Sequence, residues 1–326
     1  MNTRLLFPLV CLLIASVALA QDDTYNLRYK FTPNETLDYQ ITMSGTIPMD
    51  LTPGPEAGIP AMGIDIAMDI SMLTSQACKA VDDQGQGAVE VTYPSSTFRT
   101  SVQTGDQPVE MLMTWEKGVL TNTVNGQVQP ADENARKLAQ MLGTPIEMTI
   151  LPNGKSTVDP ETAKLLSTMM TASGGMTMDV SRLSALTNGL PDKPVKIGDT
   201  WGIQDSVAMG GATLAGTSNL KLAAIETFEG VRTARIEGEA RLSITGQMPG
   251  SSPMGIPVET NITRLDIAMT FVNHFDLDRG NLLLTSMNLC QNMAMMLSMG
   301  GQGAAQPVHI PATIENAQMT IEMRRK

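Results

Sequence analysis

The chain has 326 residues, 33 acidic against 22 basic side chains, a formal net charge of −11 and only two histidines. This acidic balance argues against nucleic acid and anionic membrane surfaces as partners, because both need basic patches to neutralise phosphate. The length suffices for one large domain or two halves with a substantial hydrophobic core.

The first twenty residues are expected to be a signal peptide. Arg4 supplies the positive start, and residues 5–17 form an apolar core too short to cross a membrane. Residues 18–20 fit a cleavage site between Ala20 and Gln21, and no cysteine follows it to carry a lipid anchor. We therefore expect a soluble exported protein, periplasmic or secreted, with no transmembrane segment after cleavage.

Two cysteines, Cys78 and Cys290, lie beyond that cleavage site. In an oxidising compartment they are compatible with a disulfide that ties the two ends of the chain together. Two buried free thiols within strands are equally compatible with the sequence. The sequence leaves both alternatives open.

Residues 21–128 are expected to form a first β half. The most regular stretch places Ile64, Ile66, Met68, Ile70 and Met72 on one face, with polar or small residues between them. This alternation is typical of a strand with one buried and one wet face. The strand-like pattern continues to about residue 81 and predicts a strand about 60 Å long. Strands of this length must twist and bend.

The middle segment, residues 129–189, is expected to be helical. Apolar stripes at helical spacing predict helices over 131–142 and 160–171, and a third short helix is expected after Asp179. These helices are too short to be stable alone, so we expect them to lie on an apolar surface.

Residues 190–326 are expected to form a second β half. It opens at residues 190–201, where two prolines bar helix and a Gly-Asp pair can turn the chain. Ile267, Met269 and Phe271 then share one face of a strand, and residues 276–280 are expected to turn it back as a hairpin.

An echo between the halves predicts an internal duplication. The tetrapeptide Asp-Ile-Ala-Met occurs at residues 65–68 and again at 266–269, each time after a Pro/Gly loop that contains Met-Gly-Ile. Convergent, compositionally simple β sequence is the alternative explanation.

These patterns predict an α+β fold that is mainly antiparallel β. We expect one long curved sheet or an incomplete barrel, with two or three short helices packed on its concave side.

Chemistry-bearing motifs are sparse. The two histidines, His274 and His309, are expected at a strand end and in a loop, and neither has metal-ligand spacing. The Asp276-x-Asp278-x-Gly280 run resembles a calcium loop, but it lacks the third acid and the distal glutamate, so a hairpin turn is favoured. We expect no catalytic residue, cofactor or resident metal, and no enzyme unless carboxylates such as Asp65 and Asp69 face a cleft.

Methionine is unusually common, with 25 residues against 6 Phe, 4 Tyr and 2 Trp. Closely spaced thioethers at residues 293, 295, 296 and 299 could bind Cu(I). Methionine that fills a loosely shaped interior or lines an apolar cavity is the favoured explanation. The residues expected to line such a cavity are Ile66, Met68, Ile70, Met72, Leu166, Met169, Met170, Ile267, Met269 and Phe271.

The segment Leu190–Trp201 resembles an L-P-x-K-P-V-K-x-G-D-x-W signature of exported bacterial proteins of unknown function. Those proteins often begin the mature chain with a segment like Leu27–Phe31, and they offer no catalytic residues to carry over. By strand pattern the chain is also similar to the lipoprotein-carrier fold, a curved sheet over helices whose hollow binds acyl chains. This second resemblance is an analogy of architecture.

Two functions therefore suit the sequence. The first is a non-enzymatic exported protein that holds a lipid, acyl chain or other apolar ligand between sheet and helices. The second is a structural or protein-interaction module of the cell envelope whose interior is filled by its own side chains.

Overall fold

The computed structural model describes residues 23–54, 60–103, 108–131, 133–158, 189–209, 212–246, 248–251, 258–299 and 308–326. The predicted signal peptide, its cleavage site and the predicted helices over 160–171 and after residue 179 lie outside these ranges. Within them the chain forms one helix, α1 (Glu133–Gly143), and fifteen strands that belong to one sheet. The strands are β1 (Thr36–Leu51), β2 (Met62–Val81), β3 (Gly87–Gln103), β4 (Pro108–Glu116), β5 (Val119–Val124), β6 (Gln127–Gln129), β7 (Ile146–Ile150), β8 (Ser156–Val158), β9 (Thr200–Met209), β10 (Ala212–Phe228), β11 (Val231–Gly246), β12 (Met248–Ser251), β13 (Val258–Asp276), β14 (Asn281–Met299) and β15 (Val308–Arg325).

The strand order is β6-β5-β4-β3-β2-β1-β15-β14-β13-β11-β10-β9, with β12 paired to β13 and the β7–β8 hairpin joined to β3. Every pairing along this path is antiparallel. The mainly antiparallel β fold predicted from the sequence is confirmed. Strands from both predicted halves lie in one sheet, because β1 pairs with β15 from Tyr39 opposite Arg325 to Leu51 opposite Ala312.

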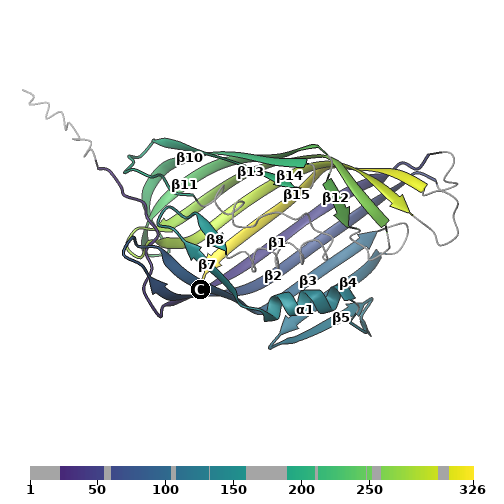
Figure 1. Ribbon diagram of the computed structural model, residues 1–326, viewed down its shortest axis with the longest axis horizontal. Coiled ribbons are helices and arrows are strands. Elements are labelled where there is room, and N and C mark those ends of the chain that lie inside the picture. The colour runs from purple at the N-terminus through teal and green to yellow at the C-terminus, as the bar shows by residue number, and fades with distance from the viewer. Residues whose placement is uncertain are drawn as a thin grey trace, which may run out of the picture.

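The sheet curves along its width into an open trough. In Figure 1, β10 and β11 form one wall, β3 and β4 form the other, and β1 and β15 lie between them. The β2 strand has 20 residues, which at roughly 3.3 Å per residue makes it about 65 Å long. Shifts in register occur in several pairings, including one between Leu73 and Ser75 of β2, opposite Pro94 of β3. Bulges of this kind let long strands bend.

The two faces of the sheet differ sharply in polarity. On β2, Ile64 is buried and the next apolar residues on its face are half-buried, whereas Asp65 and Asp69 on the opposite face are exposed. The carboxylates considered as possible catalytic groups therefore point to the outer polar face, away from the concave side. We call the apolar side the inner face.

Cross-strand pairing aligns inner-face residues into rows that run across the whole trough. The two copies of the predicted repeat meet in these rows, because β2 and β13 run in the same direction four strands apart. One row contains Ala240, Met269, Leu289, Met319, Gly45, Met68, Thr100 and Met111. The next contains Gly238, Phe271, Met287, Ile321, Met43, Ile70, Phe98 and Met113.

Helix α1 lies against the β3–β4–β5 wall (Figure 1). It begins and ends within two residues of the prediction, and Ala135 and Leu142 from the predicted stripe are buried. Its last residue, Gly143, is next to the Trp115 ring, and the Trp115 indole N–H donates a 2.8 Å hydrogen bond to the Tyr93 carbonyl. No helix in the described part of the chain is both long and apolar enough to cross a membrane.

Several hairpins are closed by tight turns that contain a glycine with positive φ. The turns at Lys117-Gly118 and Glu229-Gly230 have positive φ at both central residues, at 50° and 83° and at 49° and 80°. Two positive φ values define the type I′ turn, which matches the twist of the flanking strands. Asn125-Gly126, with φ of 48° and 75°, makes a third such turn that the sequence analysis did not anticipate.

Candidate apolar ligand-binding face

The inner face is not equally covered along the trough. On β11 and β13 it is buried: Ile267, Met269 and Phe271 are only 5%, 2% and 3% exposed. On β14, β15 and β1 to β4 many of its side chains are half-buried, and we call this region the open apolar face. Its described members are Leu289, Met293, Met319, Ile321, Met323, Ile41, Met43, Ile47, Ile66, Met68, Ile70, Met72, Phe98, Met111 and Met113.

The predicted lining residues thus fall into three groups. Ile66, Met68, Ile70 and Met72 lie on the open apolar face. Ile267, Met269 and Phe271 lie on the same inner face but inside the packed core. Leu166, Met169 and Met170 lie outside the described residues.

The open apolar face is almost free of charge. Inner-face positions on β14, β15 and β1 to β4 carry aliphatic, thioether and aromatic groups, with a few hydroxyls and amides such as Thr100 and Gln291. Arg325, at one end of β15, is the exception among the described inner-face positions of these strands. A face of this composition offers an apolar ligand contact area without competing charges.

The positions that shape the open apolar face were only partly visible in the sequence. Met43 and Met319 each belong to an alternating apolar run, so their burial on one face could be predicted. Their proximity could not, because it depends on the pairing of β1 with β15 across almost the whole length of the chain.

Residues 190–201 and the start of the described chain lie together at one end of the trough. Tyr25 and Val195 exchange two backbone hydrogen bonds of 2.7 and 3.0 Å. The Arg28 guanidinium donates to the Pro191 carbonyl at 2.6 Å and also to the Asp192 carbonyl. Residues 190–201 are therefore a structural strap that holds residues 25–31, and together we call these two segments the end clamp.

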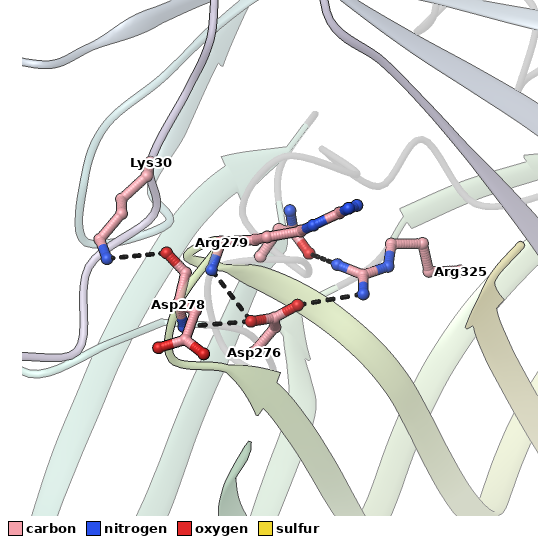
Figure 2. Close-up of polar contacts among 6 residues, drawn as sticks. Lys30, Asp276, Asp278, Arg279 and Arg325 are labelled. Atoms are coloured by element: carbon pink, nitrogen blue, oxygen red, sulfur yellow. Dashed lines mark hydrogen bonds and ion pairs between the residues drawn. The ribbon is translucent and has the colours of Figure 1, made fainter. Parts of the chain in front are cut away.

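The end clamp also contacts two turns. The Tyr29 amide donates to the Pro152 carbonyl at 2.8 Å, and the Lys30 amide donates to the Gly280 carbonyl at 2.9 Å. Figure 2 shows the Lys30 side chain reaching the β13–β14 turn, where its Nζ is 3.1 Å from the Asp278 carbonyl oxygen. Gly280 has a φ of 66°, and a Cβ there would lie 2.7 Å from the Arg28 carbonyl oxygen. The clamp thus depends on a close backbone approach at Gly280.

Asp276 joins this turn to the end of β15. Its Oδ1 accepts hydrogen bonds from the amides of Asp278 and Arg279 at 3.1 and 2.9 Å. Its Oδ2 is 3.0 Å from Arg325 Nη2, and Arg325 also donates to Asn281 Oδ1 (Figure 2). The Asp276 carboxylate therefore stabilises the predicted hairpin turn through these hydrogen bonds. Calcium is not needed to explain the Asp-x-Asp-x-Gly run.

Two tyrosines lie near this ion pair, Tyr39 buried and Tyr29 half-buried. Burial raises the pKa of Tyr29, whose ring meets the Phe275 ring edge-on at 5.3 Å between centroids. Burial also raises the pKa of Tyr39, although Arg325 opposes the shift.

The remaining side chains considered as metal ligands do not come together at one site. The described residues contain no cluster of three or more His, Cys, Asp or Glu able to hold a metal. Along β14, Met295 and Met296 are adjacent and point to opposite faces, so the four closely spaced methionines cannot surround one Cu(I) ion. His309 was predicted in a loop, but it lies in β15 with its Nδ1 2.8 Å from the Ser298 hydroxyl oxygen.

Comparisons with known proteins give no relative from which a role could be transferred. No protein-family model matches the sequence, and no curated protein matches it either. Among solved structures, the crystal structure of Acinetobacter baumannii OccAB4 is matched at 7% identity over 90% of this chain and 99% of that chain, with a TM-score of 0.20. At that score the likeness carries no information on fold or function.

Proposed function

We propose that this protein is an exported, non-enzymatic lipid-binding protein that holds hydrocarbon chains against the open apolar face. The observation that carries this proposal is the half-buried stretch of aliphatic and thioether side chains on six neighbouring strands. Soluble monomers rarely leave contiguous apolar patches of more than a few hundred Å² uncovered, and larger patches mark binding surfaces.

The dimensions of the open apolar face support an elongated ligand. On β2 it extends from Ile66 to Met72, which is six residues or about 20 Å. Six neighbouring strands at about 4.8 Å spacing add a width of about 24 Å. An extended hydrocarbon chain can lie along the strands over this distance.

The chemistry of the face supports hydrocarbon over a polar ligand. A ligand portion with charges or many hydrogen-bonding groups would lose water there without gaining partners, which costs free energy. Methionine side chains are flexible and polarizable, so they can adapt to chains of different shape. The charged or polar end of the ligand would remain outside the trough.

A packed interior remains the second candidate, and one observation favours it for part of the molecule. On β11 and β13 the inner face is filled by its own side chains: the Phe271 ring covers Gly238, where an added Cβ would lie within 2.9 Å of its Cε1 atom. We therefore propose that the ligand lies on the inner face of β14, β15 and β1 to β4, and not on that of β11 and β13.

Binding of a fluorescent fatty acid and native mass spectrometry of protein purified from its host test the proposal. Ile70→Gln places a polar amide on the open apolar face, whereas Ser71→Gln places the same group on the outer polar face as a matched control. We expect Ile70→Gln to weaken fatty-acid binding about tenfold, corresponding to about 1.4 kcal/mol, and Ser71→Gln to leave it unchanged. No fatty-acid uptake by the wild-type protein, or equal affinities for both variants, would contradict the proposal.

A further inference from the structure

We propose that the methionines at the centre of the open apolar face are a modification site for two-electron oxidants, and that sulfoxide formation there releases the bound hydrocarbon chain. The release step rests on the function proposed above. The oxidants are of the hypohalous-acid class, and the modified groups are the thioethers of Met43, Met68 and Met319, which we call the thioether cluster.

A missing side chain brings the thioether cluster together. Met319 on β15 and Met68 on β2 both pair directly with Gly45 on β1, from opposite sides. A Cβ at Gly45 would lie 2.5 Å from Met319 Cγ, so the Met319 side chain lies across the space that Gly45 leaves open. Met43 precedes Gly45 by two residues and therefore shares its face. Three sulfur-bearing side chains thus surround one glycine.

Exposure separates this cluster from two buried methionines of the same inner face. Met43, Met68 and Met319 are half-buried, whereas Met49 and Met269 are buried at 6% and 2% exposure. A small polar oxidant arrives from water, so it reaches the half-buried thioethers first. The buried pair provides an internal reference within one molecule.

Oxidation of the thioether needs no reactant other than the oxidant. A lone pair of the methionine sulfur attacks the oxygen of hypochlorous acid, an S–O bond forms and the O–Cl bond breaks. Chloride leaves with the electron pair of that bond and the hydroxyl proton goes to water. The sulfur is oxidised by two electrons to the sulfoxide and the chlorine is reduced to chloride, with no further co-reactant.

The product changes the character of the face. A sulfoxide is polar and accepts hydrogen bonds, whereas the thioether was apolar. The inner-face residues paired directly with Met43 and Met319, namely Ile70, Ile321, Leu289 and Gly45, offer no side-chain donor to it, whereas Met68 pairs with Thr100, whose hydroxyl can donate. A sulfoxide at Met43 or Met319 therefore requires water, which competes with the hydrocarbon chain for the same space.

Stoichiometric hypochlorous acid followed by peptide mass mapping tests the modification site. We expect sulfoxide at Met43, Met68 and Met319 to form at least tenfold faster than at Met49 and Met269, and a bound fluorescent fatty acid to slow it. Uniform oxidation of all five residues, or faster oxidation of the buried pair, would overturn the assignment. The ratio of the oxidation rates is measured without ligand, so it stays decisive even if the proposed function fails.

The Met43→Leu/Met68→Leu/Met319→Leu variant tests the release. Leucine conserves the volume and apolar character of methionine but cannot form a sulfoxide. After oxidation we expect the wild-type protein to bind fatty acid at least tenfold more weakly and methionine sulfoxide reductase treatment to restore it. The leucine variant should lose markedly less affinity, because only the other methionines of the open apolar face, such as Met72 and Met113, can still be oxidised in it. Equal losses in both proteins, with circular dichroism unchanged, would refute the release. Absence of binding before oxidation would instead refute the proposed function.

Discussion

At the scale of single residues, glycine decides how closely neighbouring elements approach. Gly45 lies where β1 and β15 pair, and a Cβ at this position would lie 2.9 Å from Met319 Cα and closer still to the Gln318 carbonyl oxygen. Because those atoms belong to the backbone, no side-chain rotation relieves the contact. The pairing that joins the first and last long strands thus requires glycine here.

Gly45→Ala is expected to destabilise the protein. Forcing an extra methyl group into a packed site costs about 1–3 kcal/mol, because backbone or side chains must shift. Urea unfolding followed by circular dichroism measures the change. Gly202→Ala is the matched control, since a Cβ there would meet its nearest atom, the Ser218 carbonyl oxygen, at an ordinary 3.5 Å. Equal stabilities of the two variants would contradict the steric argument.

His274 makes the stability of the folded protein depend on pH. It is buried on the outer face, and its ring stacks on Phe228 with centroids 3.9 Å apart. Burial lowers the pKa of His274 from its ordinary value of 6.5; Arg235 adds to the shift, while Glu226 and Glu229 oppose it. Below about pH 6.5 the unfolded chain therefore binds this proton more readily than the folded protein does, and stability falls as pH falls.

The expected result is that wild-type protein loses more stability between about pH 7 and pH 5.5 than His274→Gln does. The comparison isolates this histidine, because both proteins share all carboxylates. Urea unfolding at three pH values in that range measures the difference. Parallel pH dependences would show that His274 does not contribute.

At the scale of elements, the turn between β13 and β14 is locked to the end of β15. The Asp276–Arg325 pair is buried, with side chains 3% and 9% exposed. Removing one partner of a buried ion pair leaves the other charge without compensation, which costs about 3–5 kcal/mol. Arg324, the next residue, points to the opposite face and pairs with exposed Glu229.

Arg325→Met is therefore expected to destabilise the protein by about 3–5 kcal/mol. Arg324→Met removes an exposed pair and is expected to cost less than about 1 kcal/mol. Adding Asp276→Asn to Arg325→Met should recover part of the loss, because it removes the uncompensated charge. A double-mutant cycle by urea unfolding measures these changes, and similar losses for the two single variants would contradict the difference in burial.

The sequence predicted individual strands and turns better than it predicted which strands pair with each other. The alternation from Ile64 to Met72 predicts a strand and its two faces, and the Glu229-Gly230 pair predicts a turn, because both signals are local. The pairing of β1 with β15 has no local signal, since it joins residues almost three hundred positions apart. The open apolar face spans that junction, so its residues could be proposed separately but not assembled from sequence.

At the scale of the whole molecule, the strand order suits the predicted duplication. β4-β3-β2-β1 and β15-β14-β13-β11 follow one another in the sheet, each a run of four antiparallel strands. Met68 and Met269, equivalent in the two sequence echoes, lie in the same transverse row. A common origin of the halves stays a prediction, but this correspondence extends the likeness from four residues to eight strands.

The same strand order separates the two cysteines. Cys290 on β14 pairs with Gln318, Gln318 with Thr46, and Thr46 with Ala67 of β2. Cys78 lies eleven residues farther along β2, about 36 Å from that position at roughly 3.3 Å per residue. A disulfide needs Cα atoms within about 7 Å, so the two thiols of one chain cannot join. Both are free in the structure.

We therefore expect iodoacetamide to label both Cys78 and Cys290 when the protein is unfolded without reductant, as peptide mass mapping would show. In the folded protein Cys78 should react more slowly than Cys290, because it is buried and burial raises the pKa of its thiol. The unfolding midpoint should be the same with and without dithiothreitol, since no cross-link constrains the unfolded chain. A disulfide-linked peptide containing both residues would require β2 and β14 to be neighbours, and would overturn the strand order on which the open apolar face depends.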